Sequence, residues 1–210
     1  VATAETSFAP ALPVIGGADK IAFVRNNELW MMNVDASDPK QLTTDGVAKF
    51  NLQWLPDGKT ILYMSGKTVK TVDIESEREE IIFNYISAEY FESFSVSPDG
   101  TQAALVINRE LFVVPYDLEK LKTANKKSAL MDMKGCLFYN DLAVKGAKWS
   151  DDGTRLAVKY IANSNGKFAD SVRIMDISKC SELPPTIDDF PNGRFKFPNE
   201  IVNYDYDGDL

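Results

Sequence analysis

Short segments in which apolar and polar residues alternate recur along the chain, and they come in pairs separated by a turn. Segments of four to six residues, rich in Val, Ile, Leu and aromatic side chains and bounded by Asn, Asp, Gly or Pro, predict antiparallel β-hairpins. The predicted strand pairs are 21–25 with 28–33, 61–64 with 69–73, 103–107 with 110–114, and 156–160 with 171–176. A helical pattern is confined to 117–124 and predicts a short excursion between the third and fourth strands of one sheet.

The same tight turn precedes three of these hairpins. It occurs as Pro56-Asp57-Gly58, Pro98-Asp99-Gly100 and Asp151-Asp152-Gly153. Pro and Asp favour the first positions of such a turn, and Gly supplies a positive φ. One copy would be an ordinary surface turn. Three copies in the same strand context indicate a structural repeat in which these nine residues form the corners.

The repeat has a period of 40 to 53 residues, measured between strand starts at 21, 61, 103, 156 and 201. Short strands at this period predict an all-β fold, a β-propeller of four-stranded antiparallel blades. A β-sandwich would not need the same corner in each repeat, and solenoids of this period are helical. The first repeat departs from the pattern, because residues 15–19 lack the Pro-Asp-Gly corner.

The predicted domain organisation is a linker or closing strand at 1–11 followed by a propeller over 12–210. Its blades are expected at 12–44, 48–90, 92–133 and 143–190, with an incomplete blade at 194–210. An unclosed ring would expose strand edges, so these blades predict a fragment of a six- to eight-bladed ring. The ring would be closed by a longer native chain, by a partner, or by the N-terminal segment in a five-bladed arrangement.

The corner sequences resemble a known family. The segments Trp54-Leu-Pro-Asp-Gly58, Val96-Ser-Pro-Asp-Gly100 and Trp149-Ser-Asp-Asp-Gly153 are similar to the Pro-Asp variety of the WD-type repeat in TolB-like β-propellers. The resemblance covers about 12–210. It implies an exported bacterial protein, or a domain beside a peptidase, that serves as a platform for docking proteins. The matching residues are corner and core positions, so the resemblance does not identify a ligand.

The amino-acid composition excludes several kinds of catalytic and metal site. The chain has 210 residues, a net charge of −8 and no histidine. Ser-His-Asp and Cys-His catalysis and histidine zinc sites therefore cannot be built from this chain alone. No nucleophile elbow, phosphate-binding glycine loop or Cys-x-x-Cys occurs. The pairs Asp151-Asp152 and Asp188-Asp189 lie in a corner and a turn and do not indicate a glycosidase cleft. We expect no catalytic residues and no enzyme activity here.

Net charge and hydropathy also indicate which partners and which cellular location to expect. A net charge of −8 argues against nucleic acid, whose phosphates need a basic surface. No apolar run reaches the roughly 18 residues of a membrane span. The start of the chain is rich in Ala, Thr, Ser and Pro and does not begin with Met, which is typical of a mature end after a removed signal or of a chain trimmed by design. We expect an extracytoplasmic location: periplasmic, secreted or surface-anchored.

Two features suggest a crosslink or a metal. Cys136 and Cys180 are an even pair, which predicts a disulfide in an exported protein, with two buried free thiols as the alternative. The oxygen-bearing residues near the end alternate as at the start of a calcium loop: Asn203, Asp205, Asp207 and Asp209. The carboxylate needed at the twelfth loop position would lie past Leu210, so a turn in the fifth blade is favoured. We expect no cofactor, with calcium as the weak candidate.

Two groups of side chains are candidate surfaces. Five aromatic residues would form a stacking platform for sugar or peptide, although packing between adjacent blades is favoured: Phe83, Tyr85, Tyr90, Phe91 and Phe94. Four lysines would dock an acidic partner, although a solvated loop is favoured: Lys120, Lys122, Lys126 and Lys127.

These observations favour a non-catalytic, exported β-propeller that binds a protein or peptide partner, because a rigid scaffold presents many loops. The first alternative is the propeller domain of a larger, prolyl-oligopeptidase-like hydrolase whose catalytic domain lies outside this chain. A carbohydrate-active propeller, either lyase or glycosidase, is the third interpretation.

Overall fold

The computed structural model describes residues 19–85, 87–178 and 186–190, and these form four antiparallel sheets that follow one another along the chain. The first sheet contains β1 (Lys20–Arg25), β2 (Glu28–Asn33) and β3 (Lys40–Gln41). The second contains β4 (Lys49–Trp54), β5 (Thr60–Ser65), β6 (Thr68–Asp73) and β7 (Glu79–Asn84). The third contains β8 (Phe91–Val96), β9 (Gln102–Ile107), β10 (Glu110–Pro115) and β11 (Leu137–Tyr139). The fourth contains β12 (Ala143–Trp149), β13 (Arg155–Ser164), β14 (Lys167–Asp176) and β15 (Thr186–Phe190).

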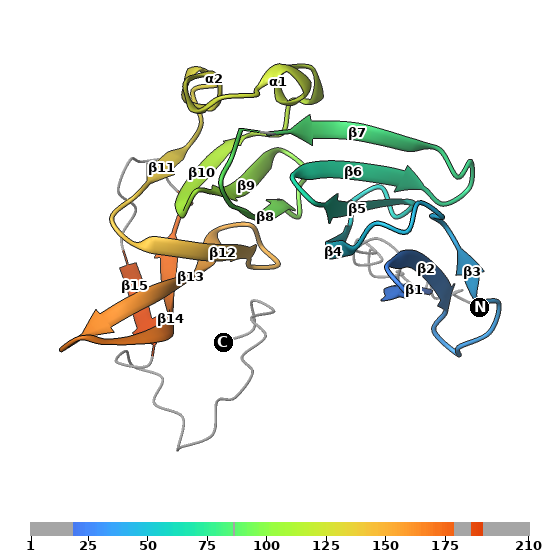
Figure 1. Cartoon of the computed structure of the whole chain (residues 1–210), viewed down its shortest axis with the longest axis horizontal. Helices are drawn as coiled ribbons and strands as arrows, with labels where there is room; N and C mark the ends of the chain where they lie inside the picture. The colour runs from blue at the N-terminus through green and yellow to red at the C-terminus, as the bar shows by residue number, and fades with distance from the viewer. Residues whose placement is uncertain (1–18, 86, 179–185, 191–210) are drawn as a thin grey trace, which may run out of the picture.

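The four sheets stand side by side around an arc, with β4 and β8 toward its concave side (Figure 1). The middle strands β5 and β9 are buried on both faces, because neighbouring sheets cover both faces of the second and third sheets. Their sequences are therefore nearly continuous apolar runs, at 61–64 in β5 and 103–107 in β9. The expected propeller of antiparallel blades is confirmed, with four strands in three of the described sheets and three strands in the first, and the sheets are called blades from here on.

Apolar clusters fill the spaces between consecutive blades. Four of the five predicted aromatic residues lie in the core shared by the second and third blades. The ring centroid of Phe83 lies 5.5 Å from that of Phe91 and 6.0 Å from that of Phe94. Tyr85 stacks on Phe83 as well, whereas Tyr90 is 46% exposed. Core packing is thus confirmed for all of the group except Tyr90.

Two short helices, α1 (Leu118–Thr123) and α2 (Lys127–Asp132), separate β10 from β11. Both lie on the convex side of the arc (Figure 1). The sequence pattern predicts the first helix but not the second, and each helix buries one leucine, Leu121 in α1 and Leu130 in α2. Since both helices precede the last strand of the third blade, β11 falls after the range 92–133 expected for that blade.

The hairpin of β13 and β14 is longer than the sequence predicts. Its ladder continues without a break from Arg155 opposite Asp176 to Ser164 opposite Lys167. The sequence predicts strands only at 156–160 and 171–176, whereas the connection is a tight turn at Asn165 and Gly166, with φ of 52° and 77°. Asn-Gly suits a turn that needs positive φ at both positions, so the flanking residues remain free to pair as strands.

A buried ion pair joins the first and second blades. The side chain of Lys49 at the start of β4 is 0% exposed, and its Nζ lies 3.0 Å from Oε2 of Glu28. Lys49 also binds the carboxylate of Asp45. Burial acts to raise the pKa of Glu28, but hydrogen bonds from Thr43, Gly46 and Lys49 outweigh it and hold the pKa below its ordinary value.

Side chains also bridge the first strands of adjacent blades. Gln53 in β4 donates from Nε2 to the Val96 carbonyl at 2.6 Å and accepts from the Val96 N–H at 2.8 Å. Trp149 in β12 donates from Nε1 to the Ser95 carbonyl at 3.2 Å. The Gln53 amide therefore pairs with the backbone N–H and C=O of Val96 in β8, as a neighbouring strand would.

Candidate functional site

The three predicted corners share one set of hydrogen bonds. Each aspartate accepts from the backbone N–H two residues later and from a threonine hydroxyl. The O···N distances are 3.0 Å from Asp57 to Lys59, 3.0 Å from Asp99 to Thr101, and 2.9 Å from Asp152 to Thr154. The corner glycines have positive φ: 73° at Gly58, 71° at Gly100 and 68° at Gly153. The carboxylates are thereby engaged in holding the turns.

Consecutive corners also contact one another. A Cβ placed on Gly100 would lie 3.6 Å from Cγ of Pro56, and one placed on Gly153 would lie 3.6 Å from Cδ of Pro98. Each of these glycines therefore packs on the proline of the preceding blade's corner. Asp151 occupies the proline position in the third corner.

Asp152→Ala is expected to lower the free energy of unfolding by about 1–2 kcal/mol, because the Thr154 N–H and the Ser150 hydroxyl lose their acceptor. Urea unfolding measures the change. The control is Asp151→Ala in the same turn, whose carboxylate accepts no hydrogen bond from the described residues, and we expect it to stay within about 0.5 kcal/mol of the wild type. Equal losses in both variants would contradict the corner geometry.

The effect of Asp152→Ala should also depend on pH. Hydrogen bonds from Ser150 and Thr154 lower the pKa of Asp152 to about 2. Because the pKa is lower in the folded than in the unfolded chain, the stabilisation is complete above about pH 4 and is lost as the pH falls toward 2. The difference between wild type and variant should therefore shrink over that window.

Other predicted residues have structural partners or lie outside the described ranges. Asp189 accepts two bonds from the Arg173 guanidinium, at 2.7 and 2.9 Å, which ties β15 to β14. The calcium candidates Asn203, Asp205, Asp207 and Asp209, and also Cys180, lie outside the described residues, so the calcium site and the disulfide stay predictions. Cys136 lies just before β11 and packs against the core between the third and fourth blades.

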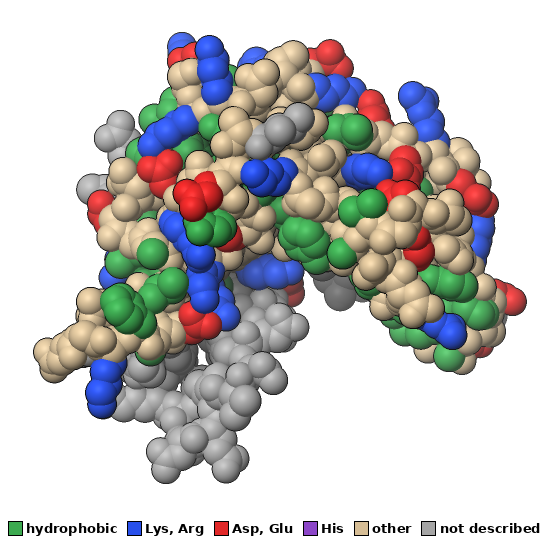
Figure 2. Space-filling model, in the orientation of Figure 1, with side chains coloured by type: hydrophobic (Ala, Val, Ile, Leu, Met, Phe, Trp, Pro, Cys, Tyr) green, Lys and Arg blue, Asp and Glu red, His purple; other side chains and the backbone are tan. Residues whose placement is uncertain are grey.

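The lysine group is largely paired within the chain. Lys122 lies 2.7 Å from Glu80, Lys127 lies 2.7 Å from Glu110, and Lys120 lies 3.2 Å from Asp117. Figure 2 shows basic and acidic side chains interspersed over the visible face of the blades. The described lysines of this group therefore do not form an unpaired basic patch.

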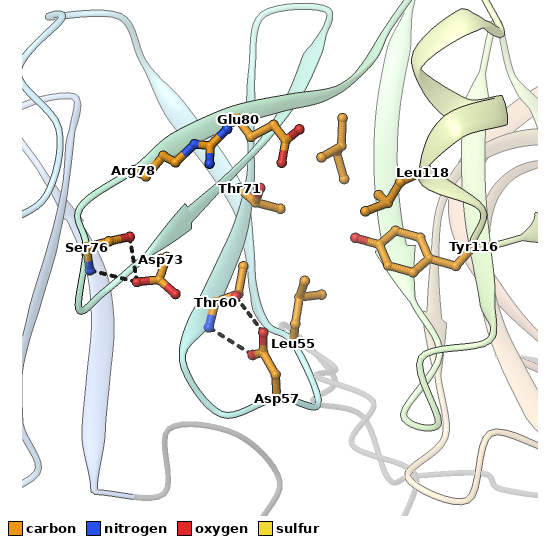
Figure 3. Close-up of a pocket in the computed structure, with 11 residues that line it drawn as sticks. Leu55, Asp57, Thr60, Thr71, Asp73, Ser76, Arg78, Glu80, Tyr116 and Leu118 are labelled. Atoms are coloured by element: carbon orange, nitrogen blue, oxygen red, sulfur yellow. Dashed lines mark hydrogen bonds between the residues drawn. The ribbon is translucent and has the colours of Figure 1, made fainter.

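A groove of about 450 Å³ lies between the second and third blades (Figure 3). Its first wall is the second blade, formed by the corner at Asp57 and the ends of β5, β6 and β7. The opposite wall is the segment entering α1, with Tyr116 and Leu118. Lys122 on α1 reaches back to Glu80 on β7, so a hydrogen bond of 2.7 Å spans the two walls.

Strand alternation explains why polar groups gather in this groove. Val69, Thr71 and Asp73 share one face of β6, since every second residue of a strand points the same way. Val69 belongs to the core between the two blades, whereas Thr71 and Asp73 line the groove. Glu80 is the cross-strand neighbour of Thr71 on β7. The same face is thus apolar in the core and polar where the blades diverge.

Several of these polar groups are not satisfied by the described residues. Thr71 is 8% exposed, and its hydroxyl forms no hydrogen bond with them. Oδ1 of Asp73 accepts from the Ser76 N–H at 2.7 Å and Oε1 of Glu80 accepts from Lys122 at 2.7 Å. The second oxygen of each carboxylate accepts no hydrogen bond in the described part of the chain. The Glu80 side chain is 44% exposed, so its second oxygen is open to solvent, whereas Thr71 is largely buried. These groups make the groove a candidate binding site.

The environment of the groove raises the pKa of the Tyr116 hydroxyl. Burial raises the pKa of its hydroxyl to about 12, with the negative charges of Asp57 and Glu80 acting in the same direction. The groove therefore disfavours negative charge at this position.

No sequence pattern predicts this groove. Thr71 and Asp73 continue the alternation of β6, and Tyr116 follows β10, but residues from two blades meet here only because α1 folds back on β7. Within the described ranges, no group of three or more Cys, Asp or Glu side chains is placed to hold a metal ion. None of the helices in the same ranges is long and apolar enough to cross a membrane.

No protein-family model matches the chain, and no curated protein sequence matches it. Solved structures do match. Hydrazine synthase from Kuenenia stuttgartiensis is similar with a TM-score of 0.56 and 15% identity, over 90% of this chain and 52% of that chain. A chain of the mitotic checkpoint complex is similar with a TM-score of 0.54 and 12% identity, over 83% of this chain and 61% of that chain.

TolB from Acinetobacter baumannii is 16% identical over 81% of this chain and 53% of its own, with a TM-score of 0.46. At such identities the similarity concerns the fold alone, and the fold is a β-propeller. This chain spans about half the length of the TolB and hydrazine synthase chains that it matches.

Proposed function

We propose that this chain is a non-catalytic propeller module that binds a protein or peptide partner, and that the groove between its second and third blades is a binding site. One observation carries the proposal: Thr71, which is 8% exposed, Asp73 and Glu80 line one groove, and the Thr71 hydroxyl and the second oxygen of each carboxylate have no hydrogen-bond partner among the described residues. An extended peptide supplies N–H and side-chain donors that match such acceptors.

The arrangement of the walls supports binding to a preformed site. The first wall belongs to a packed blade, and the Glu80 to Lys122 hydrogen bond joins it to α1, next to the opposite wall. A rigid site reduces the entropy that a partner loses when it binds. Leu55, Ile82 and Leu118 add apolar surface beside the polar groups. Action outside the cytoplasm belongs to the same proposal, and formation of the Cys136 to Cys180 disulfide in the exported chain would support it.

Panning a displayed random-peptide library on the immobilised chain tests the proposal. Selected peptides should bind Tyr116→Ala about tenfold more weakly than the wild type, since truncating a buried aromatic at an interface costs more than about 1 kcal/mol. The matched control is Tyr90→Ala, which removes an exposed tyrosine outside the groove and should leave affinity unchanged. Circular dichroism checks that both variants fold. Failure to enrich any peptide, or equal binding to Tyr116→Ala, would overturn the groove assignment.

The runner-up function is a propeller domain of a larger hydrolase. In that case the catalytic residues would come from a separate domain. Reading the gene beyond the codon for Leu210 discriminates the two, because a nucleophile elbow in an α/β domain would favour the hydrolase. A carbohydrate-active propeller is tested by cleavage of polymeric sugars.

A further inference from the structure

We propose that the groove between the second and third blades holds a lysine or arginine side chain of the partner. The inference rests on the proposed function, since it names the chemistry of the group that enters that same site. It follows from which groups of the groove are occupied and which are not.

The groove contains carboxylate oxygens that can accept hydrogen bonds. Asp57, Asp73 and Glu80 all line the groove. Asp57 uses both oxygens in its own corner, where it binds two backbone N–H groups and the Thr60 hydroxyl. Asp73 and Glu80 each keep one oxygen that accepts no hydrogen bond from the described residues. A basic side chain offers several N–H donors to such oxygens, and hydrogen bonds between charged groups are roughly twice as strong as neutral ones.

Thr71 and Tyr116 complement these carboxylates. Thr71 lies directly across from Glu80 in the ladder of β6 and β7, and both residues line the groove. Tyr116 stands on the opposite wall, facing the second blade (Figure 3). An aromatic ring attracts a cation, and the neighbouring Leu55 and Leu118 offer apolar surface to the aliphatic stem of a long basic side chain.

Positive charges of the chain act on the groove carboxylates only in part, since Lys122 and, more weakly, Arg78 lower the pKa of Glu80. Arg78 is the one basic residue among the described residues that line it, and its side chain is exposed and forms no ion pair with them. Lys122 occupies one oxygen of Glu80. The raised pKa of Tyr116 arises from burial and from Asp57 and Glu80, with no cation among its causes. An anionic group would meet this negative field, whereas a cation is stabilised by it.

Nuclear magnetic resonance titration of the folded chain tests the inference. The probe is the peptide acetyl-Gly-Ser-Gly-Arg-Gly-Ser-Gly-amide, compared with two peptides in which norleucine or glutamate replaces arginine. We expect the arginine peptide to shift the amide signals of Thr71 and Glu80 and to bind at least about fivefold more tightly than either comparison peptide.

Three variants sharpen the test. Glu80→Gln should weaken the arginine peptide about fivefold or more, because the free carboxylate is lost. Glu79→Gln makes the same change at the next position of β7, outside the groove lining, and should leave binding unchanged. Arg78→Ala removes a like charge at the groove and should tighten the arginine peptide about twofold to fivefold. An anion-binding groove would show the opposite response to Arg78→Ala.

The outcomes separate this inference from the proposed function. Tighter groove binding by the glutamate or norleucine peptide would overturn the basic-side-chain inference and leave a peptide-binding groove in place. No groove signal shifting with the arginine peptide would also overturn it, while library panning with Tyr116→Ala decides the proposed function independently.

Discussion

Replacing Lys49 with alanine should lower the free energy of unfolding by about 3–5 kcal/mol, because removal of one partner of a buried ion pair leaves the other charge uncompensated. The Lys49 side chain is 0% exposed and the Glu28 side chain is 9% exposed, with 3.0 Å between Nζ and Oε2. Without Lys49, the Glu28 carboxylate keeps its hydrogen bonds from Thr43 and Gly46 but has no cation beside it. Urea unfolding at pH 7 measures the loss.

Two comparisons make the Lys49 prediction specific. Lys40→Ala removes an exposed lysine, paired with Glu77 at 2.6 Å, and should cost less than about 1 kcal/mol. In Lys49→Ala, burial favours the neutral form of Glu28, so lowering the pH toward 4 should reduce the difference from the wild type. A loss from Lys49→Ala that matched the loss from Lys40→Ala would show that the pair is not buried in solution.

Gly135→Ala is the second substitution with a large expected effect, a loss of about 3 kcal/mol or more in the free energy of unfolding. A Cβ at Gly135 would lie 2.2 Å from the Val113 carbonyl oxygen and 2.9 Å from Cα of Val114. Both atoms belong to the backbone of β10, so no side-chain rotation relieves the overlap. The segment between α2 and β11 would have to move away from the blade.

Gly146→Ala serves as the control for Gly135→Ala. The nearest atom to a Cβ at Gly146 is the Ser93 hydroxyl oxygen at 3.9 Å, which is ordinary contact. We expect a change within about 1 kcal/mol, since alanine at an unstrained position also reduces the freedom of the unfolded chain. Melting temperatures of the two variants settle the comparison, and similar values would argue against the close passage of residue 135 over β10.

The sequence predicts the blades well because their determinants are local. Period-two alternation sets the strands, and the corner motif sets the turn that precedes three of the hairpins. It predicts the connections less well. The helix α2 is not predicted, although it buries one leucine as α1 does, and the Asn165-Gly166 turn lets β13 and β14 extend beyond the expected strands.

The groove could not be predicted for a different physical reason. Its residues are polar positions at the ends of strands and look solvent-exposed in the sequence. Thr71 is 8% exposed although it lines the groove, and sequence alternation carries no information on how closely two blades approach. The predicted site residues, by contrast, were local motifs, and the described ones serve the turns.

The Gln53 amide has a consequence for the behaviour of the protein in concentrated solution. An inner strand edge with unpaired N–H and C=O groups is a template for the strand of another molecule. Because Gln53 occupies both backbone groups of Val96, this stretch of β8 cannot recruit a foreign strand at that residue. A glutamine that resembles an ordinary polar surface residue in the sequence thus guards against edge-to-edge aggregation between copies of the folded chain.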